Sequence, residues 1–264
     1  MNRNKLKKTY IKTIDKSMEK LLQNFSSLNL NNQTSNIVKI QKVFKGCLLR
    51  KKRLPQIMYD MAAHLKSQSF KFHKDNADGR INSCTDEDNI VKVLVDKYDK
   101  RIYTPTIRMW YDILAFDYRY GWIPINIKST TTETCDNTGN LAMCVYAYTD
   151  ELLDLKKNYR NGPMSKILYE KLENKKYNYN DKKDYYFIVM NKEKPSEVIV
   201  NSVKGLSYLT PNLNNLPFQV KWKNNKEFKY NTIDKSIKQF VDCIKRPQPS
   251  WNETFLQKMR SFNV

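Results

Sequence analysis

The strongest constraint on the fold is a pair of segments, residues 112–118 and 122–130, separated by Arg119, Tyr120 and Gly121. Short runs rich in β-branched and aromatic residues on either side of a glycine-containing turn predict a β-hairpin. Every second residue in the centre of the second strand is an isoleucine: Ile123, Ile125 and Ile127. Side chains alternate between the two faces of a strand, so we expect these isoleucines to lie on the core.

The other face of this hairpin carries charged and polar side chains. Asn126 and Lys128 alternate with the isoleucines and therefore point away from the core. If the turn is centred near Tyr120, Asp112 stands directly opposite Lys128, and directly opposed residues share a face. The sequence thus predicts an acid, an amide and an ammonium group on one face of a hairpin whose other face is a buried, rigid floor.

The chain has 264 residues, which fits one large domain or one domain with an appendage. It contains 47 lysines and arginines against 27 aspartates and glutamates, a formal charge of +20. Such an excess points to a polyanionic partner, and we expect double-stranded DNA. The alternative is a lysine-rich solvated surface that reflects a genome of skewed base composition.

Several functional classes are disfavoured by what the sequence lacks. The only histidines are His64 and His73, which argues against zinc sites rich in histidine. The 6 glycines are scattered and form no G-x-G-x-x-G motif or phosphate-binding P-loop. Nucleotide-driven motors and dinucleotide oxidoreductases are therefore not expected.

The cysteines and the lengths of the apolar runs indicate in which cellular compartment the protein is expected. The 5 cysteines show no C-x-x-C pair, so we expect reduced thiols and an intracellular, cytoplasmic protein, or one in the cytoplasm of a host cell. Apolar runs such as residues 185–190 are too short to cross a membrane, and no membrane association is expected.

The N-terminal 60 residues are expected to form a separate basic, helical region. Residues 4–23 have an apolar face at helical spacing, and the polar stretch at residues 24–36 reads as a linker. Residues 37–53 resemble an IQ motif, which implies a calmodulin-like partner. A basic amphipathic helix can equally lie on DNA or cover the core.

Residues 61–264 are expected to form an α/β domain with a mixed central sheet flanked by helices. The helices are expected at residues 83–98, from residue 137 or 138 onward, and from residue 232 to about residue 244, and the later strands at residues 185–191, 197–203 and 217–222. Glu87 lies in the first of these helices, three residues before Ile90, and so shares its inward face. It either compensates the helix dipole or reaches the hairpin.

A series of blocks follows in order along the chain: GRINS (79–83), DED (86–88), YD (111–112), PINIKST (124–130), DN (136–137), DYYFIV (184–189) and LPFQVKW (216–222). Over roughly residues 78–245 the chain thereby resembles the PD-(D/E)xK nuclease superfamily, and specifically type II restriction endonucleases. The resemblance implies a restriction-endonuclease-like core and Mg²⁺-dependent hydrolysis of phosphodiester bonds.

The resemblance also assigns roles to four residues. Asp112, Asn126 and Glu87 would hold Mg²⁺, and Lys128 would orient or activate water and stabilise negative charge. Asn126 departs from the family pattern, because an amide replaces the usual acid. It offers an oxygen but no charge and cannot act as a base.

Either another acid compensates for this amide or the site is weakened. Glu87 is the first choice for that acid, and Asp117, Glu133 and Asp136 follow it. Asp117 is also the rival of Asp112 as the motif aspartate, although it lies beside the turn and on the opposite strand parity.

DNA contacts are expected from five residues: Arg80, Ser129, Thr130, Asp136 and Asn137. Hydroxyls suit phosphate oxygens, and Asn or Arg side chains suit base edges. Arg80, Asp136 and Asn137 could equally be cap and turn residues.

The function expected from these features is site-specific cleavage of double-stranded DNA, by a homodimer, because two strands require two cuts at a symmetric site. A structure-selective nuclease or resolvase, and a DNA-binding protein with a decayed nuclease core, are the alternatives.

Overall fold

The computed structural model describes residues 53–73, 79–107, 109–212, 217–246 and 253–262. The helix expected at residues 4–23 and all of the IQ-like segment except Arg53 lie outside the described residues. Within the described ranges, no helix is both long and apolar enough to span a bilayer.

The helices are α3 (Gln56–Lys66), α4 (Gly79–Tyr98), α5 (Leu141–Tyr148), α6 (Asn161–Glu173), α7 (Ile233–Lys245) and α8 (Glu253–Ser261). The strands are β1 (Ile102–Tyr103), β2 (Ile113–Asp117), β3 (Gly121–Thr130), β4 (Cys135–Asn137), β5 (Tyr186–Asn191), β6 (Val198–Ser202) and β7 (Gln219–Lys221). Short 3-10 turns follow α4, β6 and β7. The strands expected at residues 185–191 and 197–203 and the helix expected from residue 232 are confirmed within a residue or two.

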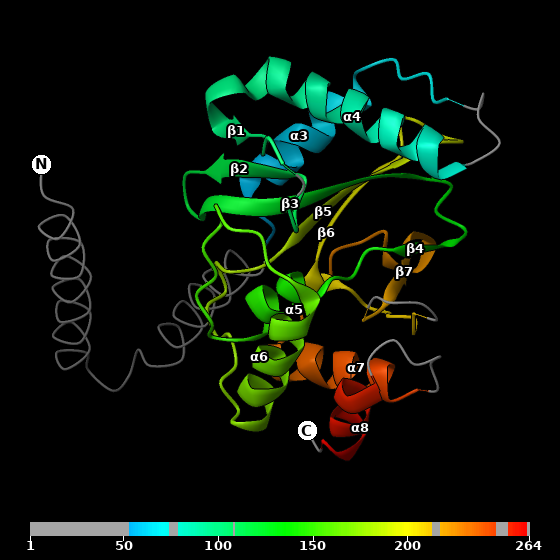
Figure 1. The fold of residues 1–264 in the computed structure, drawn as a ribbon. Coiled ribbons are helices and arrows are strands. Elements are labelled where there is room, and N and C mark those ends of the chain that lie inside the picture. The colour runs from blue at the N-terminus through cyan, green and yellow to red at the C-terminus, as the bar shows by residue number, and fades with distance from the viewer. Residues whose placement is uncertain (1–52, 74–78, 108, 213–216, 247–252, 263–264) are drawn as a thin grey trace, which may run out of the picture. The chain divides into compact units, whose positions relative to one another are not determined.

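The main sheet has the order β1-β2-β3-β5-β6 among the described strands. Strands β3 and β5 run parallel, while the other neighbouring pairs are antiparallel. Helices α3 and α4 cover one face of this sheet, and α5 to α8 lie on the other (Figure 1). The expected class, an α/β fold with a mixed central sheet flanked by helices, is confirmed at this level.

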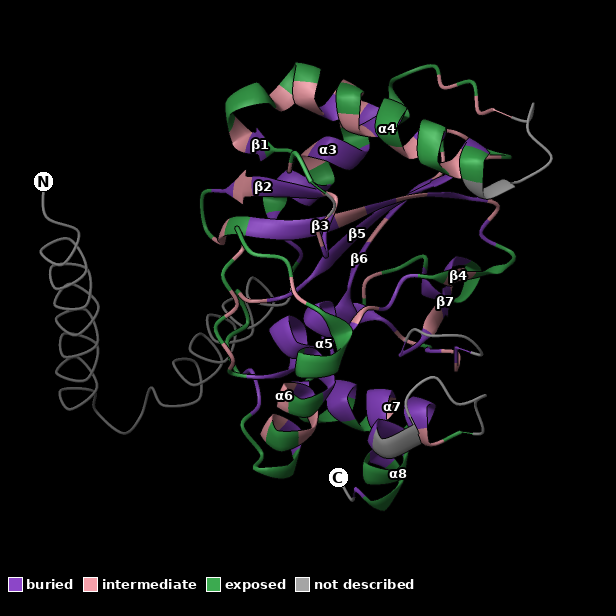
Figure 2. Ribbon diagram, in the orientation of Figure 1, coloured by how far each residue is buried: buried purple, intermediate pink, exposed green. Residues whose placement is uncertain are grey.

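Strand alternation divides the core between the two faces of the sheet. One apolar cluster joins α3 and α4 to the side chains of Ile125, Ile127 and Ile188. The other joins α5 to α8 with Phe187 and Val189. Figure 2 shows the sheet buried along most of β3, β5 and β6. The core therefore holds β3 rigidly on the face opposite its polar side chains.

The register of the β2–β3 hairpin differs from the expected one. Asp117 pairs with Gly121 and Ile113 with Ile125, so the turn is centred on Arg119 rather than Tyr120. Asp112 consequently stands one step beyond Ile113, where the opposite residue is Asn126 and not Lys128. A shift of two positions preserves strand parity, so Asp112, Asn126 and Lys128 still share a face.

Asp117 explains this shorter turn. Its carboxylate accepts hydrogen bonds from the backbone N–H groups of Arg119 (2.8 Å) and Tyr120 (3.1 Å), an aspartate turn that closes the hairpin locally. Gly121 has a φ of 76°, a conformation that glycine adopts without strain. The same carboxylate accepts from the N–H of Ile57 at 3.1 Å, which ties the first turn of α3 to the hairpin.

The expected division at residue 60 would leave part of α3 with the N-terminal region. In the structure Leu54, Ile57 and Met58 are buried against the sheet, and the compact unit begins at Arg53. Helix α3 thus belongs to the C-terminal unit.

Besides α3, helices α6 and α8 were not anticipated from the sequence. Helix α6 begins at Asn161 with Pro163 in its first turn, where the missing N–H of proline is tolerated. Helix α8 follows the last of the expected helices and buries Phe255, Leu256 and Met259.

Helices α5 and α7 pack against each other through buried aromatic side chains. Phe240 is fully buried, with its ring centroid 4.9 Å from that of Tyr148 and 6.1 Å from that of Phe218. We expect Phe240→Ala to lower the free energy of unfolding by about 3–5 kcal/mol in urea denaturation followed by circular dichroism. Leu152, which is 86% exposed, is the control, and its change to alanine should cost no more than about 0.5 kcal/mol. Equal effects of the two substitutions would contradict this packing.

Candidate active site

A cleft of about 670 Å³ opens beside the polar face of β3. Its walls come from α4, the loop before β2, strand β3 and the segment leading into α5. The candidate catalytic residues among its lining are Glu87, Asp112, Asn126 and Lys128. Asn137 also lines it. The structure therefore brings together, in one cleft, residues that the sequence alone could only propose to be neighbours.

Asp112 is fixed by the backbone of β3. Its N–H donates to the carbonyl oxygen of Ile125 at 3.0 Å, and its carboxylate accepts from the N–H of Ile127 at 2.7 Å. These bonds continue the hairpin ladder past Ile113. They leave the half-buried carboxylate beside the Asn126 side chain, on the strand face that is not packed on isoleucine.

Asn126 supplies an oxygen atom that has no hydrogen-bond partner among the described residues. Its Oδ1 is buried and accepts no hydrogen bond from any described residue. The Asn126 side chain interacts with the hydroxyl of Tyr185, which itself donates to the carbonyl oxygen of Trp110 at 2.8 Å. A buried acceptor left without a donor is costly, and one explanation for it is an ion.

Lys128 and Glu87 form a half-buried ion pair between β3 and α4. The Lys128 Nζ lies 3.3 Å and 3.4 Å from the two carboxylate oxygens of Glu87, and the N–H of Ser129 donates to the same carboxylate at 3.3 Å. This geometry confirms that the inward face of α4 carries Glu87 to the hairpin.

Burial and charge act in opposite directions on this pair. Burial disfavours the charged form of Lys128, but the attraction of Glu87 and Asp112 outweighs it, so the pKa of Lys128 lies above its ordinary value. Burial raises the pKa of Glu87, and repulsion by Asp112 adds to that rise, while Lys128 opposes it. Lys128 is thus an ammonium ion at neutral pH.

Ser129 and Thr130, which follow Lys128, were expected to contact DNA, but neither side chain reaches the surface. Ser129 and Thr130 are 4% and 7% exposed, and the Thr130 hydroxyl donates to Asp136 at 3.2 Å. Both residues thus lie inside the protein, where β3 pairs with β5. Burial raises the pKa of Asp136 more than Thr130 and Lys128 lower it. Arg80 falls in the first turn of α4, but its side chain lies outside the described part of the chain.

The rival acids lie elsewhere. Asp117 is buried in the hairpin turn, where its carboxylate is occupied by backbone N–H groups. Glu133 is exposed and pairs with Lys223 at 3.0 Å. Glu87, which lines the same cleft, therefore remains the first candidate for the acid that compensates for Asn126, and Asp136 is the second.

A second group of charged residues was missed by the sequence analysis. Asp86 is 2% exposed and accepts from the backbone N–H of His73 at 3.0 Å, with the His73 ring at 2.8 Å and Lys192 Nζ at 3.0 Å. Lys192 also donates to the hydroxyl of Ser83 at 3.1 Å. The one sequence feature that could have revealed this group is the position of Asp86 next to Glu87 on α4. Lys192 lies at the end of β5, and nothing in the local sequence links it to α4.

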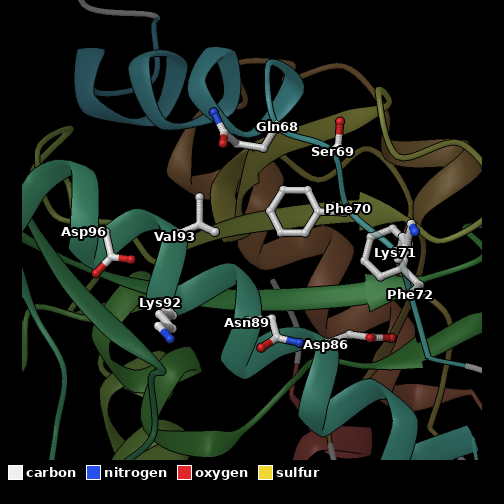
Figure 3. Close-up of a pocket in the computed structure, with 10 residues that line it drawn as sticks. All are labelled: Gln68, Ser69, Phe70, Lys71, Phe72, Asp86, Asn89, Lys92, Val93 and Asp96. Atoms are coloured by element: carbon white, nitrogen blue, oxygen red, sulfur yellow. The ribbon is translucent and has the colours of Figure 1, made fainter.

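Another hollow, of about 380 Å³, lies along α4 beside the chain that follows α3 (Figure 3). Gln68 and Phe70 line one side, and Asn89, Lys92 and Asp96 on α4 line the other. Of the charged groups described above, only Asp86 borders it. Glu87, Asp112 and Lys128 do not, so the candidate chemistry belongs to the first cleft.

In the described ranges, no three His, Cys, Asp or Glu side chains are close enough to form a metal site by themselves. No family model matches the sequence, and no curated protein and no solved structure gives a significant match. The functional argument therefore rests on the geometry of this cleft.

The raised pKa of Asp136 has a consequence for stability. A carboxyl whose folded pKa is raised favours the folded state below its ordinary pKa of 3.8, and that contribution is lost as the pH rises through the folded pKa. Asp136→Asn cannot ionise, so we expect it to gain stability relative to the wild type between pH 3 and pH 7. Urea denaturation across this range measures the gain.

The matched control is Asp242→Asn, at an exposed position on α7. A difference between Asp136→Asn and wild type that does not change with pH would show that burial of Asp136 carries no such penalty.

Proposed function

We propose that the protein is a Mg²⁺-dependent endonuclease that cleaves double-stranded DNA at specific sites. The observation that carries the proposal is the meeting of Asp112, Asn126, Lys128 and Glu87 in one cleft of a strongly basic chain. Acidic and amide oxygens beside a half-buried ammonium suit a phosphodiester, which needs stabilisation of negative charge.

The residues of the cleft fit Mg²⁺. Mg²⁺ is usually held by one or two carboxylates with water and substrate phosphate completing its shell, so a cage of three acids is not required. The Asp112 carboxylate and the Asn126 Oδ1, which has no partner among the described residues, would hold the ion, and Glu87 is a further acid in the same cleft. When bound, Mg²⁺ supplies Lewis-acid stabilisation of the phosphate and of the leaving oxygen.

Lys128 acts as a cation in this proposal. Its raised pKa keeps it protonated at neutral pH, so it stabilises charge on the phosphate and orients the attacking water rather than removing a proton. Glu87 holds the ammonium in position through its paired contacts. The backbone bond from Ile127 fixes Asp112, so the site is preorganised by the strand ladder.

The order of elements supports the finer assignment to a restriction-endonuclease-like core. A helix carrying an acid precedes an antiparallel hairpin, and a helical crossover leads to a strand parallel to β3. A homodimeric, intracellular enzyme of the type II restriction class is part of the same proposal, and a calmodulin-like partner remains a prediction.

One observation favours a second candidate, a DNA-binding protein with a decayed nuclease core. Asn126 contributes no negative charge, and among the described residues no three ligand-type acids, histidines or cysteines gather in the cleft. Binding of DNA without Mg²⁺-dependent cleavage would identify that function.

Replacing Lys128 tests the proposal. We expect wild-type protein with Mg²⁺ to cut unmethylated plasmid and phage DNA into discrete fragments, and Lys128→Ala to lower the rate at least about a hundredfold, because a positioned charge in a catalytic site contributes on that order. Gel electrophoresis of a time course measures both rates. Lys166→Ala, at an exposed lysine of α6, is the control and should cut normally. Equal rates for Lys128→Ala and wild type would sink the assignment.

Asn126→Asp tests the metal-holding role of the amide. A second carboxylate beside Asp112 should lower the Mg²⁺ concentration for half-maximal cleavage by about tenfold, since added attraction of about 1.4 kcal/mol gives that factor. A Mg²⁺ titration of the cleavage rate measures it. In a decayed site the same substitution should create cleavage where wild type has none. An unchanged Mg²⁺ requirement would place the ion elsewhere.

A further inference from the structure

We infer that Asn137 and Gln219 form a base-reading pair that selects an adenine in the bound DNA duplex. The inference deepens the proposed function, on which it rests, by naming residues that determine sequence specificity. It starts from the small sheet of β4 and β7, which lies apart from the main sheet (Figure 1).

The two amides stand opposite each other on paired strands. Asn137 on β4 is the direct cross-strand partner of Gln219 on β7. The Gln219 Nε2 donates to the Asn137 Oδ1 at 2.7 Å, and the Nδ2 of the buried Asn212 donates to the same oxygen at 3.0 Å. An oxygen that accepts two such bonds fixes the orientation of its amide. The pair is therefore held in one arrangement before any ligand binds.

The same bonds leave specific groups unused. The Asn137 Nδ2 and the Gln219 Oε1 form no hydrogen bond with any described residue, and Asn137 is exposed while Gln219 is half-buried. The pair thus presents an N–H donor and a carbonyl acceptor to solvent. It offers no charge, and a neutral donor with an acceptor is poorly suited to a phosphate, which has acceptors only.

Asn137 lies where it could contact the same DNA duplex as the proposed catalytic residues. Asn137 lines the cleft that also contains Asp112 and Lys128. A duplex whose phosphate lies at Lys128 would therefore bring neighbouring base edges towards β4. Strands β4 and β7 are each three residues long and are paired at all three positions. The amides are therefore held on regular strands rather than on a loop.

The pattern of free groups selects the base. In the major groove adenine offers an acceptor at N7 and a donor at N6, and asparagine or glutamine amides are its usual partners. Guanine offers two acceptors there and suits arginine or lysine. Because the pair combines one donor with one acceptor and no cation, adenine is the complementary base.

The test is selection of bound duplexes from a randomised DNA library, with Ca²⁺ in place of Mg²⁺ so that binding is read without cleavage. We expect wild-type protein to select an A·T pair at one fixed position, and Asn137→Ala and Gln219→Ala to lose about tenfold or more of that preference while the other selected positions persist. Asn89→Ala, at an exposed amide on α4 outside this cleft, is the matched control and should keep the preference.

Gln219→Glu gives a second readout in a side chain of the same size. A carboxylate cannot donate, so this substitution removes the bond to the Asn137 Oδ1, and we expect the adenine preference to be lost as in the alanine variants. Thermal unfolding of each variant monitors the fold.

The outcomes separate the two proposals. Adenine selection that is unchanged in Asn137→Ala and Gln219→Ala overturns the base-reading pair, even if Lys128→Ala still abolishes cleavage. Adenine selection that these variants lose supports the pair, even if no Mg²⁺-dependent cleavage occurs. Absence of any sequence preference in wild type overturns it as well.

Discussion

The structure depends on the alternation of side chains along β3. This strand is paired on both edges, antiparallel to β2 and parallel to β5, and its isoleucines are buried under α3 and α4. With one face committed to the core, Asn126 and Lys128 have only the opposite face available. A slip by one residue would bury the ammonium and expose the isoleucines, so the packing energy of the core holds the polar residues in place.

The half-buried charge of Lys128 imposes the next constraint. A cation in this position is tolerated because Glu87 contacts it through both carboxylate oxygens, and removal of either partner leaves a poorly solvated charge. The ion pair consequently fixes the position of α4 relative to β3. Asp86 and Lys192 make a second link from the same helix to the end of β5. Helix α4 is thus attached to two neighbouring strands by charges as well as by apolar packing.

Features set by neighbouring residues could be read from the sequence, and features set by distant ones could not. Local periodicity correctly predicted strands β5 and β6, the start of α7 and the two faces of β3. The hairpin register was wrong by two positions because Asp117 closes the turn with its own carboxylate. The link between Asp86 and Lys192 joins segments on either side of the hairpin and α5, and the burial of Thr130 depends on Asp136. Periodicity carries no information on either.

The parallel pairing of β3 with β5 has a consequence for how the protein is made. Glu87, Asp112, Asn126 and Lys128 all leave the ribosome before the crossover through α5 and α6 is complete, so β3 at first has an open edge. Closing that edge means bringing together segments far apart in sequence, which is the slow part of folding for such topologies. A nascent chain would carry these four side chains without the sheet that aligns them. The alignment of these side chains therefore has to wait until synthesis has passed β5, which closes the second edge of β3.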